Sequence, residues 1–187
     1  VSSFVLGTLY NPVSVLLNEW DRLMKHTIAI LLQNESGALT RVASMFSTRG
    51  YNIDSLSVAP TQDPMISRLT LVTEGSDEVI GQITKQLYKL IDVIDVLNIS
   101  QHDHIERELM MIKINVHPDK EEVIKTVLYD YSAKIINNQD DLLIVEVMAN
   151  TAKNDEFLEA LEGISTLVAI ARTGPLALAK GALTISL

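Results

Sequence analysis

Two consecutive copies of one pattern of apolar residues, at 26–99 and 109–171, constrain the fold more than any other feature of the sequence. In each copy, strand-like alternation and helix-like spacing follow one another in the order strand, helix, strand, strand, helix, strand. This order defines the split βαββαβ unit, in which two helices cover one face of a four-stranded antiparallel sheet. The sequence therefore predicts an α+β protein with two ferredoxin-like βαββαβ domains.

The first copy shows both periods. Ile28, Ile30 and Leu32 alternate with other residues, as in a half-buried strand, and a helical stripe of apolar residues begins at Leu39. Gly50 stands where a helix typically ends in the left-handed conformation. The other elements predicted in this copy are strands around 56–58, 69–71 and 91–99, and a helix that begins at Asp77 and Glu78.

The second copy follows a predicted linker, Ser100–Glu106. Its helices are expected to begin at Pro118 and at Thr151, a residue type that caps helices well. Two apolar runs flank the turn Asn138–Asp141, which predicts a hairpin. We expect Ile164–Ala171 to be the last strand. The predicted boundaries are 1–23 for an N-terminal extension or leader, 24–101 for the first domain and 102–187 for the second.

A four-stranded sheet with helices on one side leaves its other face and both edges open to water. Such sheets become stable when they pack against another sheet or another chain. We therefore expect the chain to form a homodimer.

Charge and composition exclude several classes of protein. The formal net charge is −9, and no block of basic residues occurs, so the electrostatic footprint of a nucleic-acid-binding protein is missing and attraction to an anionic membrane surface is not expected. The absence of cysteine excludes disulfides, a thiolate nucleophile and cysteine metal sites. No apolar run approaches the roughly 18 residues that cross a bilayer. We predict a cytoplasmic protein.

Residues 1–23 fall outside the repeated pattern. Phe4–Tyr10 carries no charge, as in the apolar region of a signal peptide, but a basic leading region and a small-residue cleavage site are missing. Asn11 and Pro12 resemble the start of a helix. These residues are interpreted either as an extension or leader or as a docking arm.

The sequence contains no recognisable catalytic constellation. Its histidines are His26, His102, His104 and His117; none accompanies a serine nucleophile elbow, and no phosphate-binding glycine loop occurs. His102, His104 and Glu106 have the spacing of ligands for a divalent metal, but so short a match is weak and a solvated linker explains it as well. We predict no metal site and no catalysis by this chain alone.

The stretch Gln33–Ile53 is the candidate binding site. The side-chain amide of Asn34 can donate and accept hydrogen bonds, and Gly37 lets a ligand approach the backbone where a helix begins. The N–H groups of a helix N-terminus favour a small carboxylate. Asn52 offers a second amide. Capping and turn formation explain each residue taken singly, so the spacing alone leaves both interpretations open.

Two motifs in this stretch, Asn34-Glu35-Ser36-Gly37-Ala38-Leu39 and Arg49-Gly50-Tyr51-Asn52-Ile53, closely resemble the N-terminal ACT domain of the acetohydroxyacid synthase (acetolactate synthase) small-subunit family. The resemblance spans Met24–Leu187. Further matches to that family are Ser57–Thr61, Ser67–Thr70, Lys85–Leu90, Glu106–Leu109 and Ala171–Gly174.

The resemblance implies a regulatory subunit that is not itself the enzyme. It implies association with a thiamine-diphosphate-dependent large subunit, which makes acetolactate in the first common step of branched-chain amino acid synthesis. No cofactor is expected on this chain, whereas thiamine diphosphate, FAD and magnesium are expected on the partner. The resemblance also implies that this chain activates the large subunit and confers feedback inhibition, typically by valine.

In that family the effector lies between two ACT domains. Carried onto this sequence, the resemblance places effector-binding residues of one protomer, namely Asn34, Gly37, Ala38 and Leu39, against two from the other, Asn52 and Ile53.

Two alternatives stay open from the sequence: a stand-alone amino-acid sensor of the ACT class that regulates another enzyme, and an oligomerisation module. A regulator of transcription would need a basic helix-turn-helix, which the sequence lacks. Valine, leucine and isoleucine each fit an apolar pocket and differ by about one methylene, so the preferred amino acid also stays open.

Overall fold

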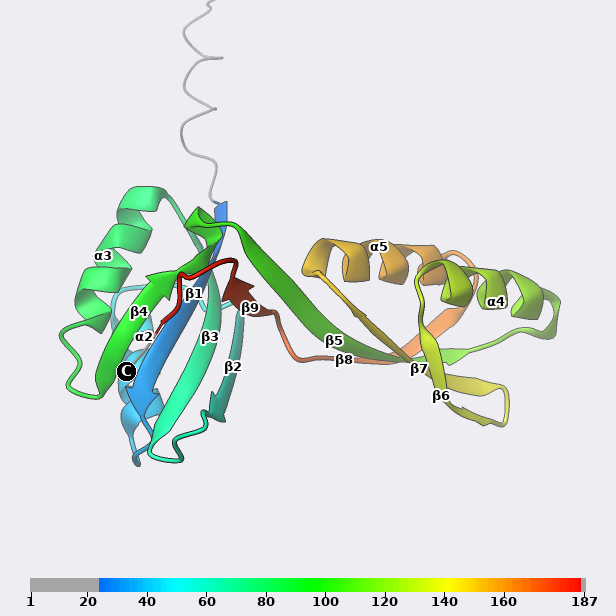
Figure 1. Ribbon diagram of the computed structural model, residues 1–187. Helices are drawn as coiled ribbons and strands as arrows, with labels where there is room; N and C mark the ends of the chain where they lie inside the picture. Colours follow the sequence, from blue (N-terminus) through cyan, green and yellow to red (C-terminus); the bar gives the residue numbers. More distant parts are fainter. Residues whose placement is uncertain (1–23, 186–187) are drawn as a thin grey trace, which may run out of the picture.

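The computed structural model describes residues 24–185; residues 1–23, for which an extension, leader or docking arm was predicted, lie outside the described residues, as do 186–187. Two sheets, each covered by two helices on one face, are joined by a long strand and a shorter returning segment (Figure 1). The predicted α+β class with two βαββαβ units is confirmed.

The first sheet is antiparallel with the strand order β2-β3-β1-β4. Ile28, Ile30 and Leu32 of β1 face the helices and are almost fully buried, as their alternation predicts. Ser76 caps α3 by accepting a hydrogen bond from the N–H of Val79. The elements are β1 (Met24–Gln33), α2 (Ala38–Thr48), β2 (Ser55–Pro60), β3 (Ile66–Gly75), α3 (Asp77–Leu87) and β4 (Val93–Asn98).

The second sheet has the order β6-β7-β5-β8, and β9 pairs with the other end of β5. The predicted hairpin is present, and its turn consists of Asp140 and Asp141, both at positive φ (52° and 63°), as a two-residue hairpin turn requires. The elements after β4 are η1 (Ile99–Gln101), β5 (His104–Asn115), η2 (Pro118–Lys120), α4 (Glu121–Asp130), β6 (Lys134–Gln139), β7 (Leu142–Ala149), α5 (Thr151–Glu162), β8 (Thr166–Arg172) and β9 (Leu176–Ala179).

Two predictions about the chain between and after the domains were wrong. The predicted linker, 100–106, is largely ordered, because η1 runs to Gln101 and β5 already begins at His104. The strand predicted over 164–171 is not the last, because β9 follows it and pairs with His104–Arg107. Both errors have one cause: the first residues of β5 find their hydrogen-bonding partner about 70 residues later, in a strand too short to show a period of its own.

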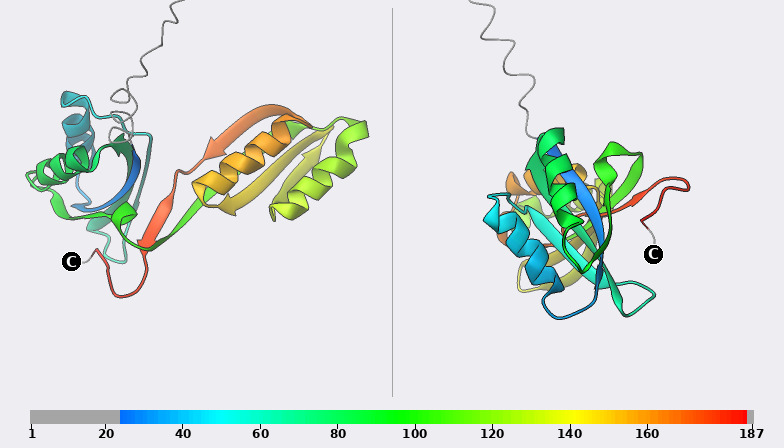
Figure 2. Two further views of the ribbon diagram at one scale, coloured as in Figure 1. Left: turned by 90° about the horizontal axis from the view of Figure 1, so that it is seen from above. Right: turned by 90° about the vertical axis from the view of Figure 1, so that its left-hand side faces the viewer.

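Residues 173–185, the return segment, bring the chain back from the second domain to the first (Figure 2). Ala177 and Ile185 are buried against Ala29, Leu31 and Ile99, on the face of the first sheet that carries no helix. The Arg68 guanidinium of the first domain also donates a hydrogen bond to the carbonyl of Ala177 (2.9 Å), and the N–H of Lys180 donates to the carbonyl of Asp103 (2.7 Å), just before β5. Part of the face that we expected to be open is therefore covered by the chain itself.

This cover predicts a stability difference between two apolar residues of the return segment. Ile185→Ala should lower the free energy of unfolding by about 2 kcal/mol, because it removes buried methyl groups and leaves a cavity, whereas Leu183→Ala should cost less than ~0.5 kcal/mol since that side chain is 42% exposed. Urea unfolding of the full chain measures both. Equal losses for the two variants would contradict the cover.

Candidate effector site

The turn after β1 presents an uncapped helix N-terminus. Gly37 is the N-cap of α2 with φ +91°, a backbone conformation that side chains disfavour, and no side chain caps the helix. Asn34 is used elsewhere: its Nδ2 donates to the carbonyl of Pro64 (2.8 Å). The capping interpretation of Asn34 and Ser36 is therefore wrong, and the first-turn N–H groups of α2 are left without a side-chain partner.

An ion pair lies beneath this turn. The Arg41 guanidinium binds the Asp92 carboxylate through both Nε and Nη2, the latter at 2.7 Å, and Asp92 is only 3% exposed. The hydrogen bond from Arg41 holds the pKa of Asp92 below its ordinary value and raises that of Arg41. A Cβ built on Gly37 would lie 3.0 Å from Nη1 of Arg41, so the guanidinium occupies the space that a side chain at 37 would take.

Asn52 and Ile53 precede β2. The Nδ2 of Asn52 donates to Oδ1 of Asp54 (2.7 Å), and its backbone carbonyl accepts a hydrogen bond from Thr73 Oγ1 (2.6 Å). Ile53 is half-buried against the first core. The amide oxygen of Asn52 is thus left to accept from a ligand while its nitrogen is held.

One chain does not bring the predicted residues together. Asn34 follows the end of β1, whereas Asn52 precedes the start of β2, which runs parallel to β1 because both are antiparallel to β3. The start of β2 is level with Thr27, and roughly 20 Å of strand separates that level from Gln33. The group from Asn34 to Leu39 and the group of Asn52 and Ile53 therefore lie at opposite ends of the domain.

Ala38 and Leu39 differ in what they offer a ligand. The Ala38 side chain is 2% exposed and belongs to the first core, and its backbone N–H donates to the carbonyl of Glu35 (3.2 Å), so Ala38 shapes the turn and has no free polar group of its own to donate. The Leu39 side chain is 37% exposed and forms an apolar surface next to the turn.

His102, His104 and Glu106, which have the spacing of metal ligands, do not converge on one point in the structure. His104 hydrogen-bonds through Nδ1 to the carbonyl of His102 (2.7 Å), and Glu106 accepts from the N–H of Thr151 (3.0 Å) at the start of α5. No group of three or more His, Asp or Glu side chains with metal-binding geometry is found among residues 24–185.

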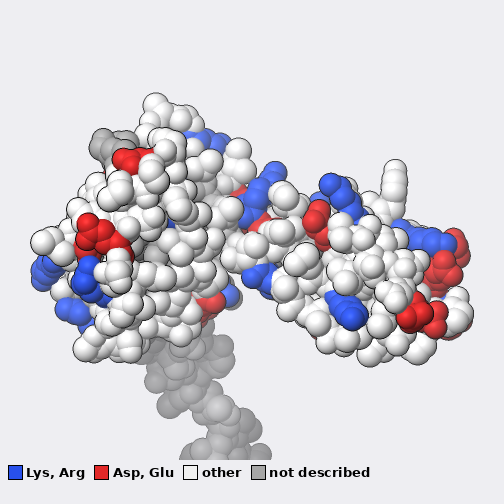
Figure 3. Space-filling view, turned by 90° about the horizontal axis from the view of Figure 1, so that it is seen from below, with Lys and Arg blue, Asp and Glu red and all other residues white. Residues whose placement is uncertain are grey.

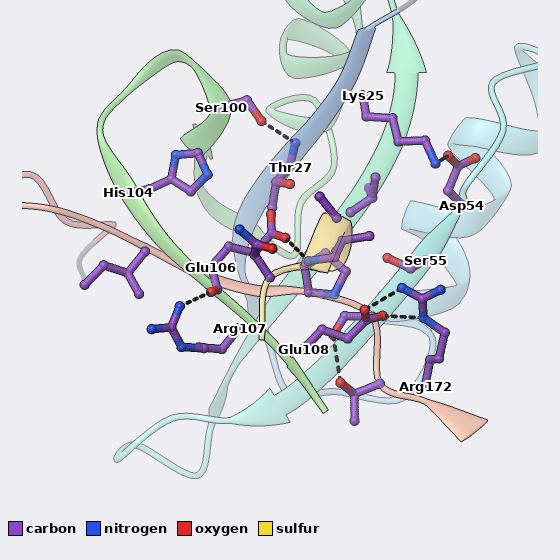
Figure 4. Close-up of a pocket in the computed structure, with 18 of the residues that line it drawn as sticks. Lys25, Thr27, Asp54, Ser55, Ser100, His104, Glu106, Arg107, Glu108 and Arg172 are labelled. Carbon is purple, nitrogen blue, oxygen red and sulfur yellow. Dashed lines mark hydrogen bonds and ion pairs between the residues drawn. The ribbon is translucent and has the colours of Figure 1, made fainter. Parts of the chain in front are cut away.

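An ionic network that sequence reasoning missed lies in the second domain, where β5, β8 and α5 meet beside the first domain. Glu108, 3% exposed, receives two hydrogen bonds from Arg172 (3.0 and 2.6 Å; Figure 4). Arg172 also donates to Asp155 (2.6 Å). These hydrogen bonds raise the pKa of Arg172. The Nδ2 of Asn154 donates to Glu108 as well (3.1 Å). Glu108 and Arg172 lie in two of the stretches that resemble the small-subunit family, Glu106–Leu109 and Ala171–Gly174, but the resemblance did not indicate that they form an ion pair.

The network borders a cleft of about 1140 Å³ between the domains, which polar and apolar residues line in similar measure. Basic and acidic side chains alternate around it, and they are also interspersed over both domains on the face seen in Figure 3. Among residues 24–185, no helix is long and apolar enough to cross a membrane.

Comparison with known proteins identifies the families that this chain matches. Residues 28–95 match the family described as the AHAS small subunit-like ACT domain, and residues 107–181 match the small subunit of acetolactate synthase. The acetolactate synthase isozyme 3 small subunit of Salmonella typhimurium is 42% identical over 158 residues, which cover 84% of this chain and 97% of that protein. The isozyme 3 small subunit of Escherichia coli is 41% identical with the same coverage.

A solved structure agrees. The crystal structure of the acetolactate synthase small subunit from Thermotoga maritima superposes with a TM-score of 0.76 at 31% identity, over 86% of this chain and 99% of that one. Fold and sequence thus define a protein with an N-terminal ACT domain and a second βαββαβ domain. The chain belongs to the acetolactate synthase small-subunit family, as its motifs predict.

The Arg41–Asp92 pair predicts an acid-dependent change in the first domain. Because the folded-state pKa of Asp92 is lowered, its contribution to stability is present above the unfolded-state pKa of about 4 and is lost as the pH falls through the folded-state value. Asp92→Asn should therefore lose less stability than the wild type on acidification. Amide hydrogen exchange of β1 across this range measures it.

The exposed Asp119 of the second domain supplies the control. Asp119→Asn should leave the acid dependence of β1 exchange unchanged. An Asp92→Asn variant with the wild-type acid dependence would contradict the role of the ion pair.

Proposed function

We propose that this chain is the regulatory subunit of a cytoplasmic acetohydroxyacid synthase. It binds valine, or a related branched-chain amino acid, between the ACT domains of two chains, activates the large catalytic subunit and makes it subject to feedback inhibition. The relatives are named as small subunits of acetolactate synthase, which supports a larger catalytic partner. In this proposal the catalytic residues, thiamine diphosphate, FAD and magnesium all belong to that partner, and the pathway is branched-chain amino acid synthesis.

One observation carries the effector site: the two predicted groups lie at opposite ends of a single domain. A ligand cannot touch both groups of one chain across roughly 20 Å. A two-fold pair of ACT domains solves this, because a symmetric interface sets one end of each domain against the other end of its partner. The site is then a property of the homodimer.

The polar groups at the two ends match a free amino acid. The N–H of Ala38 donates to the carbonyl of Glu35, so the effector carboxylate binds the next first-turn N–H groups, those of Leu39 and Thr40, which no side chain caps and where the helix dipole favours an anion. The Nδ2 atoms of Asn34 and Asn52 already donate within the protein, so both amide oxygens are left to accept from the effector ammonium group. The branched side chain packs on Leu39 and Ile53.

The function is tested by reconstitution. The full chain is mixed with a thiamine-diphosphate-dependent large subunit, and acetolactate formation is measured with and without valine. We expect higher activity with the chain present and inhibition on adding valine. A stand-alone sensor would bind valine without changing the synthase, and an oligomerisation module would do neither.

Gly37→Asp should abolish valine binding. The substitution puts a carboxylate and bulk where the effector carboxylate sits, at a strained φ of +91° and against Arg41. Like-charge repulsion and the lost contacts should weaken binding by more than ~100-fold, or about 3 kcal/mol, in calorimetry. Stimulation of the large subunit should survive, since the activating contacts lie on other surfaces.

Gly181→Asp is the matched control, with the same charge at a similar φ of +73° and no atom within 4 Å. It should bind valine like the wild type. Normal valine binding by Gly37→Asp would show that the site is elsewhere.

Mixing two defective chains tests the two-chain site directly. Asn34→Ala and Asn52→Ala homodimers should each bind valine poorly, because each lacks one amide in both sites. A mixed dimer contains one site that lacks both amides and one intact site, so refolding the two variants together should restore tight binding at a fraction of the wild-type stoichiometry. If each site lay within one chain, mixing would restore nothing.

A further inference from the structure

The backbone of the return segment meets the first domain at a very close contact. A Cβ built on Gly174 would lie 2.8 Å from both Cβ and Oγ of Ser55, the first residue of β2. Gly174 has a φ of +71°, and both it and Pro175 are buried. A side chain at position 174 would therefore collide with Ser55. A rotamer change can move the Oγ of Ser55 but not its Cβ, so relieving that collision requires a shift of backbone.

On the first-domain side, this contact is next to one half of the proposed effector site. Asn52 lies three positions before Ser55, and its amide nitrogen is bonded to Asp54, the residue that directly precedes Ser55. Asp54 in turn pairs with Lys25 of β1 (3.6 Å). Ser55 itself is paired with Val72 in the sheet. A shift of Asn52 therefore reaches Ser55 through a short, hydrogen-bonded stretch of backbone.

On the second-domain side, the residues before Gly174 are fixed in place. The N–H of Thr173 donates to the carbonyl of Leu109 (3.1 Å), and its Oγ1 accepts from the N–H of Leu109 (3.2 Å). Arg172 is bound by the buried Glu108 and by Asp155 of α5. A movement of Gly174 is thus transmitted to β5 and α5, because these hydrogen bonds tie residues 172–174 to both elements.

The cleft beside the contact gives the domains room to move. Its lining comes from both domains and includes Ser55 and residues 172–174. Figure 4 labels Ser55 of the first domain and Arg172 of the second on this lining. Because a cleft of about 1140 Å³ separates the two domains beside the contact, they can shift there without first breaking a packed interface.

We infer that the contact between Ser55 and Gly174 is the joint through which effector binding at Asn52 is transmitted to the second domain. The inference rests on the proposed function. When Asn52 of one chain engages an amino acid held by the Gly37 turn of its partner, Ser55 shifts and Gly174 shifts with it. The second domain then takes a different position relative to the first, which supplies the differential contact that regulation of the synthase requires.

The joint is tested with full-length chains reconstituted with the large subunit. Gly174→Ala places a methyl group against Ser55 and separates the two segments. The valine concentration for half-inhibition should rise at least about tenfold, within the range of typical coupling between sites, while calorimetric valine binding to the chain alone changes less than about threefold. Gly181→Ala, at φ +73° with no neighbour within 4 Å, imposes similar backbone strain and should leave both values unchanged.

A second-site change makes the test specific. Ser55→Gly removes the two atoms nearest to the new methyl group, so the double variant Ser55→Gly/Gly174→Ala should regain at least half of the lost sensitivity in a double-mutant cycle. Three results would each overturn the joint. They are a Gly174→Ala variant whose valine concentration for half-inhibition equals that of the wild type, an equal rise of that concentration in Gly181→Ala, and a double variant that regains none of the lost sensitivity to valine. A wild-type chain that neither binds valine nor confers inhibition would instead overturn the proposed function and the inference with it.

Discussion

A four-stranded sheet with helices on one face must cover its other face, and this requirement determines how the whole chain is arranged. Ala29 and Leu31 are apolar on the face without helices, and the chain covers them with Ala177 and Ile185 from its far end. The second domain is consequently held between two segments, β5 and the return segment, that both lie against the first domain. The second domain is therefore connected to the first at two places, so the two domains are not joined by a single flexible linker.

Periodicity predicted the elements whose burial is decided within one domain. Ile28, Ile30 and Leu32 reveal their strand because one face is packed by helices, and the fold class follows from the order of such elements. The same reasoning failed for β9, because four residues show too little alternation and their stability depends on a partner strand and on the uncovered face of a distant sheet. Ligand binding and helix capping use the same residue types, so the sequence could not separate these two roles for Asn34. In the structure its side chain donates to the carbonyl of Pro64 and does not cap α2.

Two ion pairs hold the segments on which the proposed site and joint depend. In each, a carboxylate that is 3% exposed is bound by two nitrogens of an arginine, Asp92 by Arg41 beneath the Gly37 turn and Glu108 by Arg172 beside Gly174. Only the carboxylate of each pair is buried, since the arginine side chains are 46% and 30% exposed, and the cost of desolvating that carboxylate offsets much of the attraction. Their two-point geometry does fix orientation. The two ion pairs thus lie where the backbone, at Gly37 and at Gly174, has to be held in one position.

The two halves of the proposed site are consequently unequal. In the proposal the Gly37 half binds through backbone N–H groups of a turn that packs against the Arg41–Asp92 ion pair, which suits it to anchor the effector. The Asn52 half is an exposed side chain at the start of an edge strand, three residues from the contact with Gly174, and is the half that can shift. In a symmetric dimer each chain supplies one anchor and one movable half. In the proposed dimer each effector would therefore move the chain that does not anchor it, and the pair of chains would be the unit of regulation.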